Sequence, residues 1–200
     1  MSDDWDDYAD GWDGNSDVRH YATRAFAALD GLAGVTGGGW QDKRVLDFGC
    51  GTGLLSEKLA PHVREVAAVD TSERMIAVLE EKALPNVRAL CTDVLDSGAR
   101  EAAGGLAGFD LICASSVCSF LPDYRGAAAV LAGLLNSGGM FVQWDWLASG
   151  EGASGLTLQQ VRDALRAAGL GSIRAEQAFE MGSGGQGMPV LMGSGIRAPD

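Results

Sequence analysis

Hydrophobic residues recur along the chain with two different spacings, and the first of them is helical. From Ser16 onward, apolar side chains recur every three or four residues, at Val18, Tyr21, Ala22, Ala25, Phe26, Leu29 and Leu32. This period is typical of a helix with one buried face, and the glycine-rich stretch 34–39 ends it. The preceding residues 1–15 are rich in Asp, Trp and Gly. They are either a frayed tail or a cap that becomes ordered over a site.

The second spacing indicates strands that alternate with helices. Five short apolar runs have the composition of buried strands: 44–48, 65–69, 87–91, 109–115 and 140–147. Helical patterns separate most of these runs, at 54–60, from a cap at Thr71 or Ser72 to about Lys82, and at 123–135 before the Asn136–Gly139 turn sequence. Such alternation predicts a parallel sheet with helices on both faces.

The C-terminal part departs from this alternation. Thr157 begins a further helix, and Gln160 is placed to complete a capping box with it. Two last strands are expected at 173–179 and 188–192. The glycine-rich connection 182–187 between them is too short for a crossover helix. These strands therefore form a hairpin, and the last strand enters antiparallel.

The chain is expected to be one α/β domain. Its 200 residues are 46% hydrophobic, enough for a sizeable core. We assign residues 1–34 to an N-terminal cap and helix, and residues 42–200 to the core. No apolar run reaches the roughly 18 residues of a membrane helix, and the acidic N-terminus does not resemble a signal peptide. A cytoplasmic monomer or homodimer without membrane contact is therefore the expectation.

Charge and cysteine usage narrow the possible partners. The net charge of −12 repels phosphate backbones, so nucleic acid is not an expected partner, although acidity also serves solubility. The four cysteines contain no CxxC pair and the two histidines stand apart, so no metal site is expected. The cysteines are expected to be reduced, buried thiols.

The strongest chemical feature follows the first predicted strand. Asp47 lies at the end of that strand, and Gly49, Gly51 and Gly53 occupy alternate positions after it. Glycines let the backbone turn sharply and let a ligand approach closely, and the next helix offers free N–H groups. Leu54 stands where a dinucleotide fingerprint needs Gly or Ala, and no P-loop lysine follows. A nucleoside ligand and a purely structural tight turn both remain open.

Acidic residues end the next two strands. Asp70 ends the second strand, where a carboxylate can accept both hydroxyls of a ribose, although it can also cap a helix. Asp93 and Val94 follow the third strand, where a carboxylate can accept a hydrogen bond from an adenine amino group. The fourth strand ends in small residues up to Ser115, which leave room beside the glycine turn.

With these residues in place, the chain resembles the class I S-adenosylmethionine-dependent methyltransferases, specifically their small-molecule branch. The segment Val45–Gly53 is similar to the first motif of that family, and Ala68–Met75 to its acidic-loop motif. Thr92–Val94, Phe109–Ile112 and Gly138–Val142 are similar to the later motifs. The resemblance implies a Rossmann-like seven-stranded sheet in the order 3-2-1-4-5-7-6, with strand 7 antiparallel. It also implies S-adenosylmethionine as cofactor and S-adenosylhomocysteine as its product.

The resemblance also implies residue roles. Asp47 and the backbone of the three glycines hold the methionine portion, Asp70 holds the ribose, and Ser115 lies beside the methionyl amine. The adenine and ribose pocket is implied for Thr71, Met75, Asp93 and Val94. The segment containing Trp5 and Trp12 resembles an aromatic cap, whose rings attract the sulfonium cation, and Arg19 can pair with the methionyl carboxylate. Core packing is an equally simple role for the Trp residues.

Methyl transfer from sulfonium is an in-line displacement that depends mainly on alignment and exclusion of water. No catalytic base stands out in the sequence. Tyr8, His20, Tyr21 and Trp146 are candidates to face a small acceptor, and Trp144 and Phe120 add an apolar rim. The expected function is methyl transfer to a small molecule. The alternatives are a methyltransferase acting on protein or nucleic acid, and a non-catalytic cofactor-binding regulator.

Overall fold

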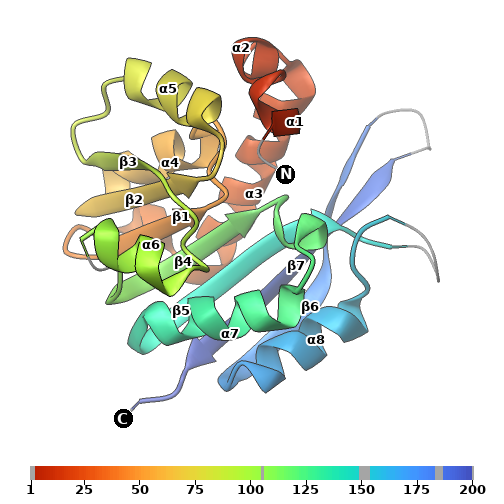
Figure 1. The fold of residues 1–200 in the computed structure, drawn as a ribbon. Helices are drawn as coiled ribbons and strands as arrows, with labels where there is room; N and C mark the ends of the chain where they lie inside the picture. Colours follow the sequence, from red (N-terminus) through yellow and green to blue (C-terminus); the bar gives the residue numbers. More distant parts are fainter. Residues whose placement is uncertain (1–2, 105, 149–153, 183–186, 200) are drawn as a thin grey trace. The chain divides into compact units, whose positions relative to one another are not determined.

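The computed structural model describes residues 3–104, 106–148, 154–182 and 187–199. In this part of the chain seven strands form one sheet in the order β3-β2-β1-β4-β5-β7-β6, as predicted. Their bounds are β1 Arg44–Phe48, β2 Glu65–Asp70, β3 Val87–Cys91, β4 Phe109–Ser115, β5 Leu135–Trp146, β6 Leu170–Met181 and β7 Met188–Arg197 (Figure 1).

Helices connect the strands and precede them. The α-helices are α1 Asp3–Asp6, α2 Ala9–Trp12, α3 Ser16–Ala33, α4 Leu54–Leu59, α5 Glu73–Glu81, α6 Ser97–Ala102, α7 Tyr124–Leu134 and α8 Leu158–Ala167. Three short 3-10 helices are η1 Val35–Gly37, η2 Ala60–His62 and η3 Cys118–Phe120. No helix in the described ranges is long and apolar enough to cross a membrane.

The chain divides into two compact units, Met1–Leu106 and Ala107–Asp200. In the first unit, β1 pairs in parallel with β2, and β2 with β3, so that the carboxyl ends of the three strands lie side by side. Helices α3 and α4 lie behind these strands in Figure 1, and α6 lies in front. Helices α1 and α2 pack against α5. We call residues 3–15 the cap segment.

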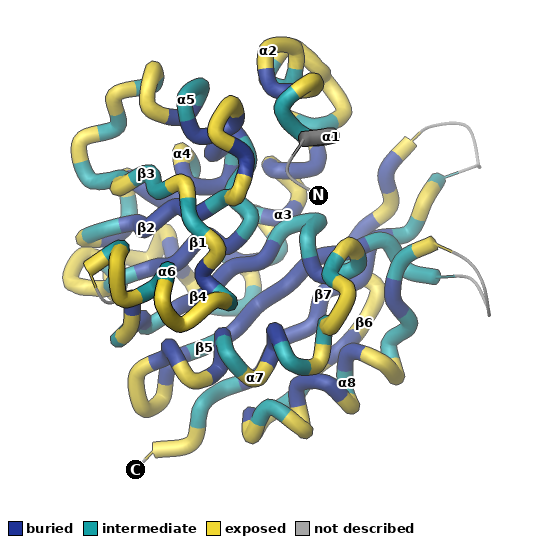
Figure 2. The backbone as a smooth tube through the Cα atoms, in the orientation of Figure 1, coloured by how far each residue is buried: buried dark blue, intermediate teal, exposed yellow. Residues whose placement is uncertain are grey.

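In the second unit, β4 pairs in parallel with β5, whereas β7 runs antiparallel to both β5 and β6. The predicted hairpin of the last two strands is thus confirmed, and residues 183–186 of its connection lie outside the described residues. Helices α7 and α8 pack against each other and cover the front of this unit in Figure 1. Figure 2 shows the middle of the strands buried and the outer helix faces exposed.

Helix ends follow the predicted capping chemistry. The Ser72 side chain caps α5 by accepting a hydrogen bond from the Met75 N–H. Thr157 and Gln160 form the capping box expected at the start of α8. Gly34 ends α3 in the left-handed conformation, with φ of 62°.

Several predicted boundaries need correction. Strand β5 begins at Leu135, so the Asn136–Gly139 sequence belongs to the strand and is not a helix-ending turn. Strands β6 and β7 are longer than the apolar runs from which they were predicted, because polar residues continue the pairing at their ends. Helix α6 had no apolar period to reveal it and has no buried residue. Residues 3–12, for which the sequence allowed either a frayed tail or a cap, form the short helices α1 and α2.

Candidate functional site

The turn after β1 is built by three glycines with positive φ. Gly49, Gly51 and Gly53 have φ of 66°, 54° and 80°, a region that residues with a β-carbon rarely adopt. The N–H groups of Gly49 and Cys50 both donate to the carbonyl oxygen of Val69, at 2.9 and 3.0 Å. The turn is therefore fastened to the end of β2 by its own backbone.

Gly51 and Gly53 serve different purposes in this turn. A β-carbon on Gly53 would lie 2.3 Å from Cδ1 of Leu79, so the absence of a side chain there allows α5 to pack. A β-carbon on Gly51 would meet nothing closer than 3.9 Å, at the Met75 sulfur and at Nε1 of Trp12. Gly51 therefore faces a cradle between a thioether and an indole, where a ligand can approach the backbone.

Asp70 joins this turn to the start of α5. Its Oδ2 accepts a hydrogen bond from the Gly51 N–H at 2.8 Å, and its Oδ1 accepts one from the Ser72 N–H at 2.9 Å. The side chain is half-buried at the end of β2. The structure thus brings together Asp70, Gly51 and Met75, three residues that the sequence predicted for one site. Thr71, also predicted, is exposed beside them.

Asp47 is fully buried at the end of β1. The Ser56 hydroxyl donates to its Oδ2 at 2.6 Å, whereas its Oδ1 is buried and has no hydrogen-bond partner among the described residues. Burial, and to a smaller extent the charge of Asp70, raises the pKa of Asp47 to about 6 despite the hydrogen bond from Ser56. A buried carboxylate oxygen without a partner is costly, and a cationic hydrogen-bond donor would relieve that cost.

Beyond β3, Asp93 is exposed and Val94 is buried. The Asp93 Oδ1 accepts a hydrogen bond from the Leu95 N–H at 2.9 Å, which shapes the loop after the strand. Because β3 pairs with β2 in register, Cys91 lies next to Asp70. Cys91 is exposed, contrary to the expected burial, and Cys113 and Cys118 are buried as expected. The four cysteines are free thiols.

The cap segment carries the predicted Trp12, whose Nε1 lies 3.9 Å from the position of a β-carbon on Gly51. The predicted Arg19 follows the cap segment in α3. Trp12 is half-buried, and Trp5 packs edge-on against it with ring centroids 6.0 Å apart. Arg19 is exposed, and its guanidinium donates to the carbonyl oxygen of Asp13. The cap segment also reaches α5, because Asp6 accepts hydrogen bonds from the Ser72 hydroxyl and from a backbone N–H.

The predicted acceptor residues of the first unit differ in exposure. Tyr8 is 60% exposed, His20 is exposed, and Tyr21 is buried in α3. An exposed Tyr8 and His20 are available to a ligand, whereas the buried Tyr21 ring contributes mainly to packing. Their roles toward an acceptor stay predictions.

In the second unit, the predicted Ser115 and Trp146 end the parallel strands β4 and β5 and are half-buried. Trp144 is completely buried, so it cannot contribute to the exposed apolar rim predicted from it. Phe120 is 48% exposed and is available for such a rim. Ser116, directly after β4, has a positive φ of 57°.

A buried polar network lies at the end of β5. Asp145 is fully buried, and it accepts hydrogen bonds from the Ser119 N–H at 2.9 Å and from the Gln143 amide at 2.8 Å. Tyr124 in turn donates its hydroxyl to Gln143 at 2.5 Å. Burial raises the pKa of Asp145 to about 6, against the effect of the bonds from Ser119 and Gln143. The sequence alone gave no signal for Gln143 and Tyr124, since the two lie far apart in the chain.

Comparison with known proteins shows that this chain is similar to methyltransferases. The model of a methyltransferase domain family matches residues 46–141. Ubiquinone biosynthesis O-methyltransferase from Aromatoleum aromaticum is 33% identical over 112 residues, covering 56% of this chain and 45% of that protein. The protein of the same name from Coxiella burnetii is 36% identical over 102 residues, covering 48% and 41%. The chain thus spans less than half the length of these curated relatives.

Solved structures share the fold at low identity. The N-methyltransferase NodS from Bradyrhizobium japonicum WM9, in complex with S-adenosylhomocysteine, has a TM-score of 0.68 at 21% identity, covering 92% of this chain and 88% of that one. The [4+2]-cyclase SpnF has a TM-score of 0.66 at 17% identity, covering 86% and 80%. One fold therefore carries methyl transfer and a different reaction, so the reaction must be argued from the site.

Proposed function

We propose that this chain, which is similar to class I S-adenosylmethionine-dependent methyltransferases in sequence and fold, transfers a methyl group from S-adenosylmethionine to a small-molecule acceptor. The observation that carries the proposal is the buried Asp47 oxygen without a partner, at the end of the strand that leads into the glycine turn. An ammonium group such as that of the methionyl portion satisfies this oxygen in a charge-assisted hydrogen bond.

The remaining contacts are proposed residue by residue. The backbone of Gly49, Gly51 and Gly53 would pass along the methionine portion, with Arg19 toward its carboxylate. Asp70 would accept the ribose hydroxyls, which its half-buried position at the end of β2 supports. The rest of the proposed pocket would be lined by Thr71, Met75, Asp93, Val94 and Trp12.

S-adenosylmethionine, when bound, supplies a methyl carbon activated by the positive charge on its sulfur. The task of the protein is then to hold that carbon in line with the lone pair of the acceptor and to keep water away. The cofactor would supply the methyl group, and the carbon–sulfur bond broken in the transfer would leave its electron pair on sulfur. A residue of the protein would have to withdraw a proton only if the acceptor were a neutral hydroxyl or a protonated amine.

We propose a small apolar or aromatic acceptor. The curated relatives named as ubiquinone biosynthesis O-methyltransferases, and NodS as an N-methyltransferase, support a small molecule without fixing the methylated atom. The 60% exposed Tyr8 side chain of the cap segment provides apolar surface for such a ligand. The net charge of −12 disfavours nucleic acid as acceptor.

Calorimetric titration with S-adenosylmethionine and S-adenosylhomocysteine tests the cofactor site. We expect micromolar binding to the wild type and at least tenfold weaker binding to Asp70→Ala. Asp96→Ala is the matched control, because the Asp96 carboxylate likewise accepts a hydrogen bond from a backbone N–H, that of Ala99 at 2.7 Å, but lies outside the proposed site. Absence of binding to the wild type, or equal losses in both variants, would overturn the assignment of the cofactor site.

A second candidate follows from the likeness to SpnF, whose reaction is named as a cyclisation. Here the chain would bind the cofactor without transferring its methyl group. Incubation with isotopically labelled S-adenosylmethionine and a panel of phenols, catechols, amines and quinols separates the two. Labelled product with any acceptor supports methyl transfer, and tight binding without product across the panel supports the second candidate.

A further inference from the structure

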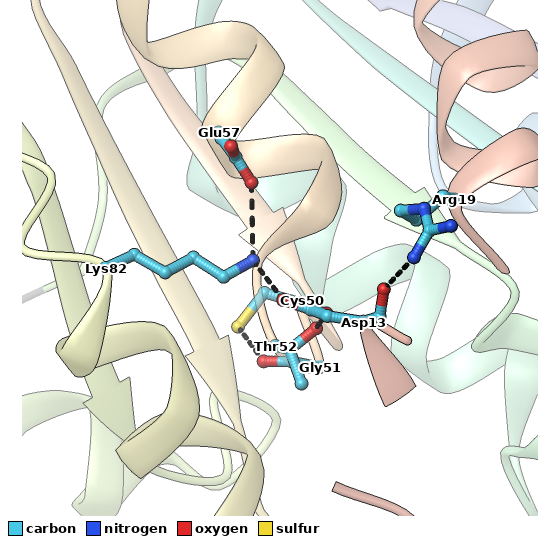
Figure 3. Close-up of polar contacts among 7 residues, drawn as sticks. All are labelled: Asp13, Arg19, Cys50, Gly51, Thr52, Glu57 and Lys82. Carbon is cyan, nitrogen blue, oxygen red and sulfur yellow. Dashed lines mark hydrogen bonds and ion pairs between the residues drawn. The ribbon is translucent and has the colours of Figure 1, made fainter. Parts of the chain in front are cut away.

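Lys82 joins three separate segments of the first unit. It follows the end of α5, and its ammonium group lies 2.7 Å from Oδ2 of Asp13 and 3.3 Å from Oε2 of Glu57 in α4 (Figure 3). Its side chain is only 16% exposed, compared with 33% for Asp13 and 53% for Glu57. The pair with Asp13 is thus the less hydrated of the two, and it connects α5 to the cap segment.

Asp13 is held through both carboxylate oxygens. Its Oδ1 accepts a hydrogen bond from the Thr52 hydroxyl at 2.5 Å, while its Oδ2 faces Lys82. Thr52 is fully buried and lies between the two glycines of the turn. Figure 3 shows the Asp13 carboxylate between Thr52 and the Lys82 ammonium. One side chain of the cap segment is therefore anchored to the proposed cofactor turn itself.

The neighbour of Asp13 in the chain is Trp12. Its Nε1 lies 3.9 Å from the position that a β-carbon of Gly51 would occupy, on the open side of the turn. Trp12 makes its ring contact with Trp5, another member of the cap segment. The anchor at Asp13 consequently fixes where the indole of Trp12 lies over Gly51.

A second ion pair of the cap segment provides a comparison. Asp10 pairs with Arg74 of α5 at 2.6 Å, but the two side chains are 71% and 50% exposed. Exposed pairs of this kind contribute little and are strongly screened by salt. Lys82 is more shielded and is shared by two carboxylates, so the loss of its charge removes the ion pair that Asp13 and Glu57 each make with it.

We propose that Lys82 and Asp13 are positioning residues that set how long the cofactor stays bound, by holding Trp12 over the glycine turn. This rests on the proposed function, because it takes the glycine turn as the cofactor site. Neither side chain has to touch the cofactor. They act on its escape, since the cap segment must move away from Gly51 before a ligand under the indole can leave.

The test measures dissociation of S-adenosylhomocysteine by stopped-flow tryptophan fluorescence. Lys82→Met and Asp13→Asn are expected to raise the dissociation rate at least tenfold, with the association rate changed less than threefold. Asp13→Asn keeps an oxygen for the Thr52 hydroxyl, so it removes the ion pair alone. Lys82→Arg is expected to stay within threefold of the wild type. Asp10→Asn, the matched control, is expected to stay within twofold.

The coupling between the two residues gives a readout that a merely structural role would not move. A double-mutant cycle of Asp13→Asn with Lys82→Met should show that the two effects do not add. Hydrogen exchange of the backbone amides of residues 9–12 should be faster in Lys82→Met than in the wild type.

The outcomes separate this inference from the proposed function. If the wild type does not bind S-adenosylhomocysteine, the proposed function fails and the inference fails with it. If the wild type binds but dissociation from folded Lys82→Met is unchanged, the inference fails alone. Equal acceleration in Asp10→Asn would also overturn it, because any loosening of the cap segment would then suffice.

Discussion

Two buried aspartates, one in each unit, look alike in charge and burial but differ in their hydrogen bonds. Asp47 ends β1 and Asp145 lies near the end of β5, and both are fully buried. Burial raises the pKa of each to about 6. Asp145 has a donor on each oxygen, whereas Asp47 has a donor on one oxygen only.

We propose that the difference separates a structural carboxylate, Asp145, from a ligand-binding one, Asp47. The donors on Asp145 come from β5 and from the 3-10 helix after β4, so it fastens that loop to the strand. The open oxygen of Asp47 costs stability in the free protein, because a buried polar atom is desolvated without compensation. A fold retains such a cost where a ligand relieves it. High pKa and burial alone therefore do not identify a functional carboxylate.

The largest expected effect is one that the two aspartates share. A folded-state pKa of about 6, compared with 3.8 for the ordinary carboxyl, means that each binds an extra proton in the folded state between these pH values. The stability that each contributes is fully present below about pH 4 and is lost as the pH rises through 6. About two pKa units correspond to about 3 kcal/mol for each carboxyl.

Urea denaturation of the wild type, Asp47→Asn and Asp145→Asn between pH 4 and pH 7.5 checks this expectation. The unfolding free energy of the wild type should fall as the pH rises from 4 to 7.5. In each variant this fall should be about half as large, because Asn does not titrate. Identical pH dependence in all three proteins would show that neither carboxyl titrates in this range.

Replacement of Asp145 by Ala should cause the next largest change. It leaves the Ser119 N–H and the buried Gln143 amide without acceptors, which costs about 3 kcal/mol of unfolding free energy. We expect the affinity for S-adenosylhomocysteine, measured on the remaining folded protein, to change less than threefold. A large loss of affinity without a loss of stability would reverse the roles assigned to Asp145 and Asp47.

Asp47→Asn should have the opposite effect to Asp145→Ala: the affinity for the ligand should fall while the stability of the free protein does not. Asn retains an oxygen for the Ser56 hydroxyl but offers an amide where the open carboxylate oxygen stood, so it cannot bind an ammonium group. The affinity for S-adenosylhomocysteine at pH 8 should fall by about 2 kcal/mol, the value of a charge-assisted hydrogen bond. The thermal midpoint of the free protein should not decrease. In the wild type the affinity should rise with pH through 6, and in Asp47→Asn this rise should disappear.

The sequence predicted most of the sheet and the proposed cofactor residues because their signals are local. A buried parallel strand is a continuous apolar run, and a glycine turn must have its glycines adjacent in the chain. The strand order came from the family resemblance, and the antiparallel last pair came from the short connection 182–187 as well. Boundaries failed where the pairing is irregular, as in β5, which begins at Leu135 and has a register shift before Met140.

The contacts that the sequence did not reveal join distant positions. The bond from Thr52 to Asp13 and the pair of Lys82 with Asp13 depend on how the cap segment folds back over the turn. Asp6, Asp10 and Asp13 do follow a helical spacing, which could have indicated that these residues order on a partner surface. Composition alone cannot say which cations they meet.

The smallest expected effect tests the far end of the Asp145 network. Tyr124 donates to Gln143, and burial raises the pKa of its phenol well above the ordinary value, so the hydroxyl remains a donor at all working pH values. Tyr124→Phe leaves the Gln143 oxygen without its donor and should cost about 1 kcal/mol by urea denaturation. Tyr8→Phe, on the 60% exposed Tyr8, is the control and should cost nothing measurable. If Tyr124→Phe lowered the unfolding free energy as much as Asp145→Ala, Gln143 would orient Asp145 only while Tyr124 holds the Gln143 amide. The buried Asp145 carboxylate would then depend on all three side chains.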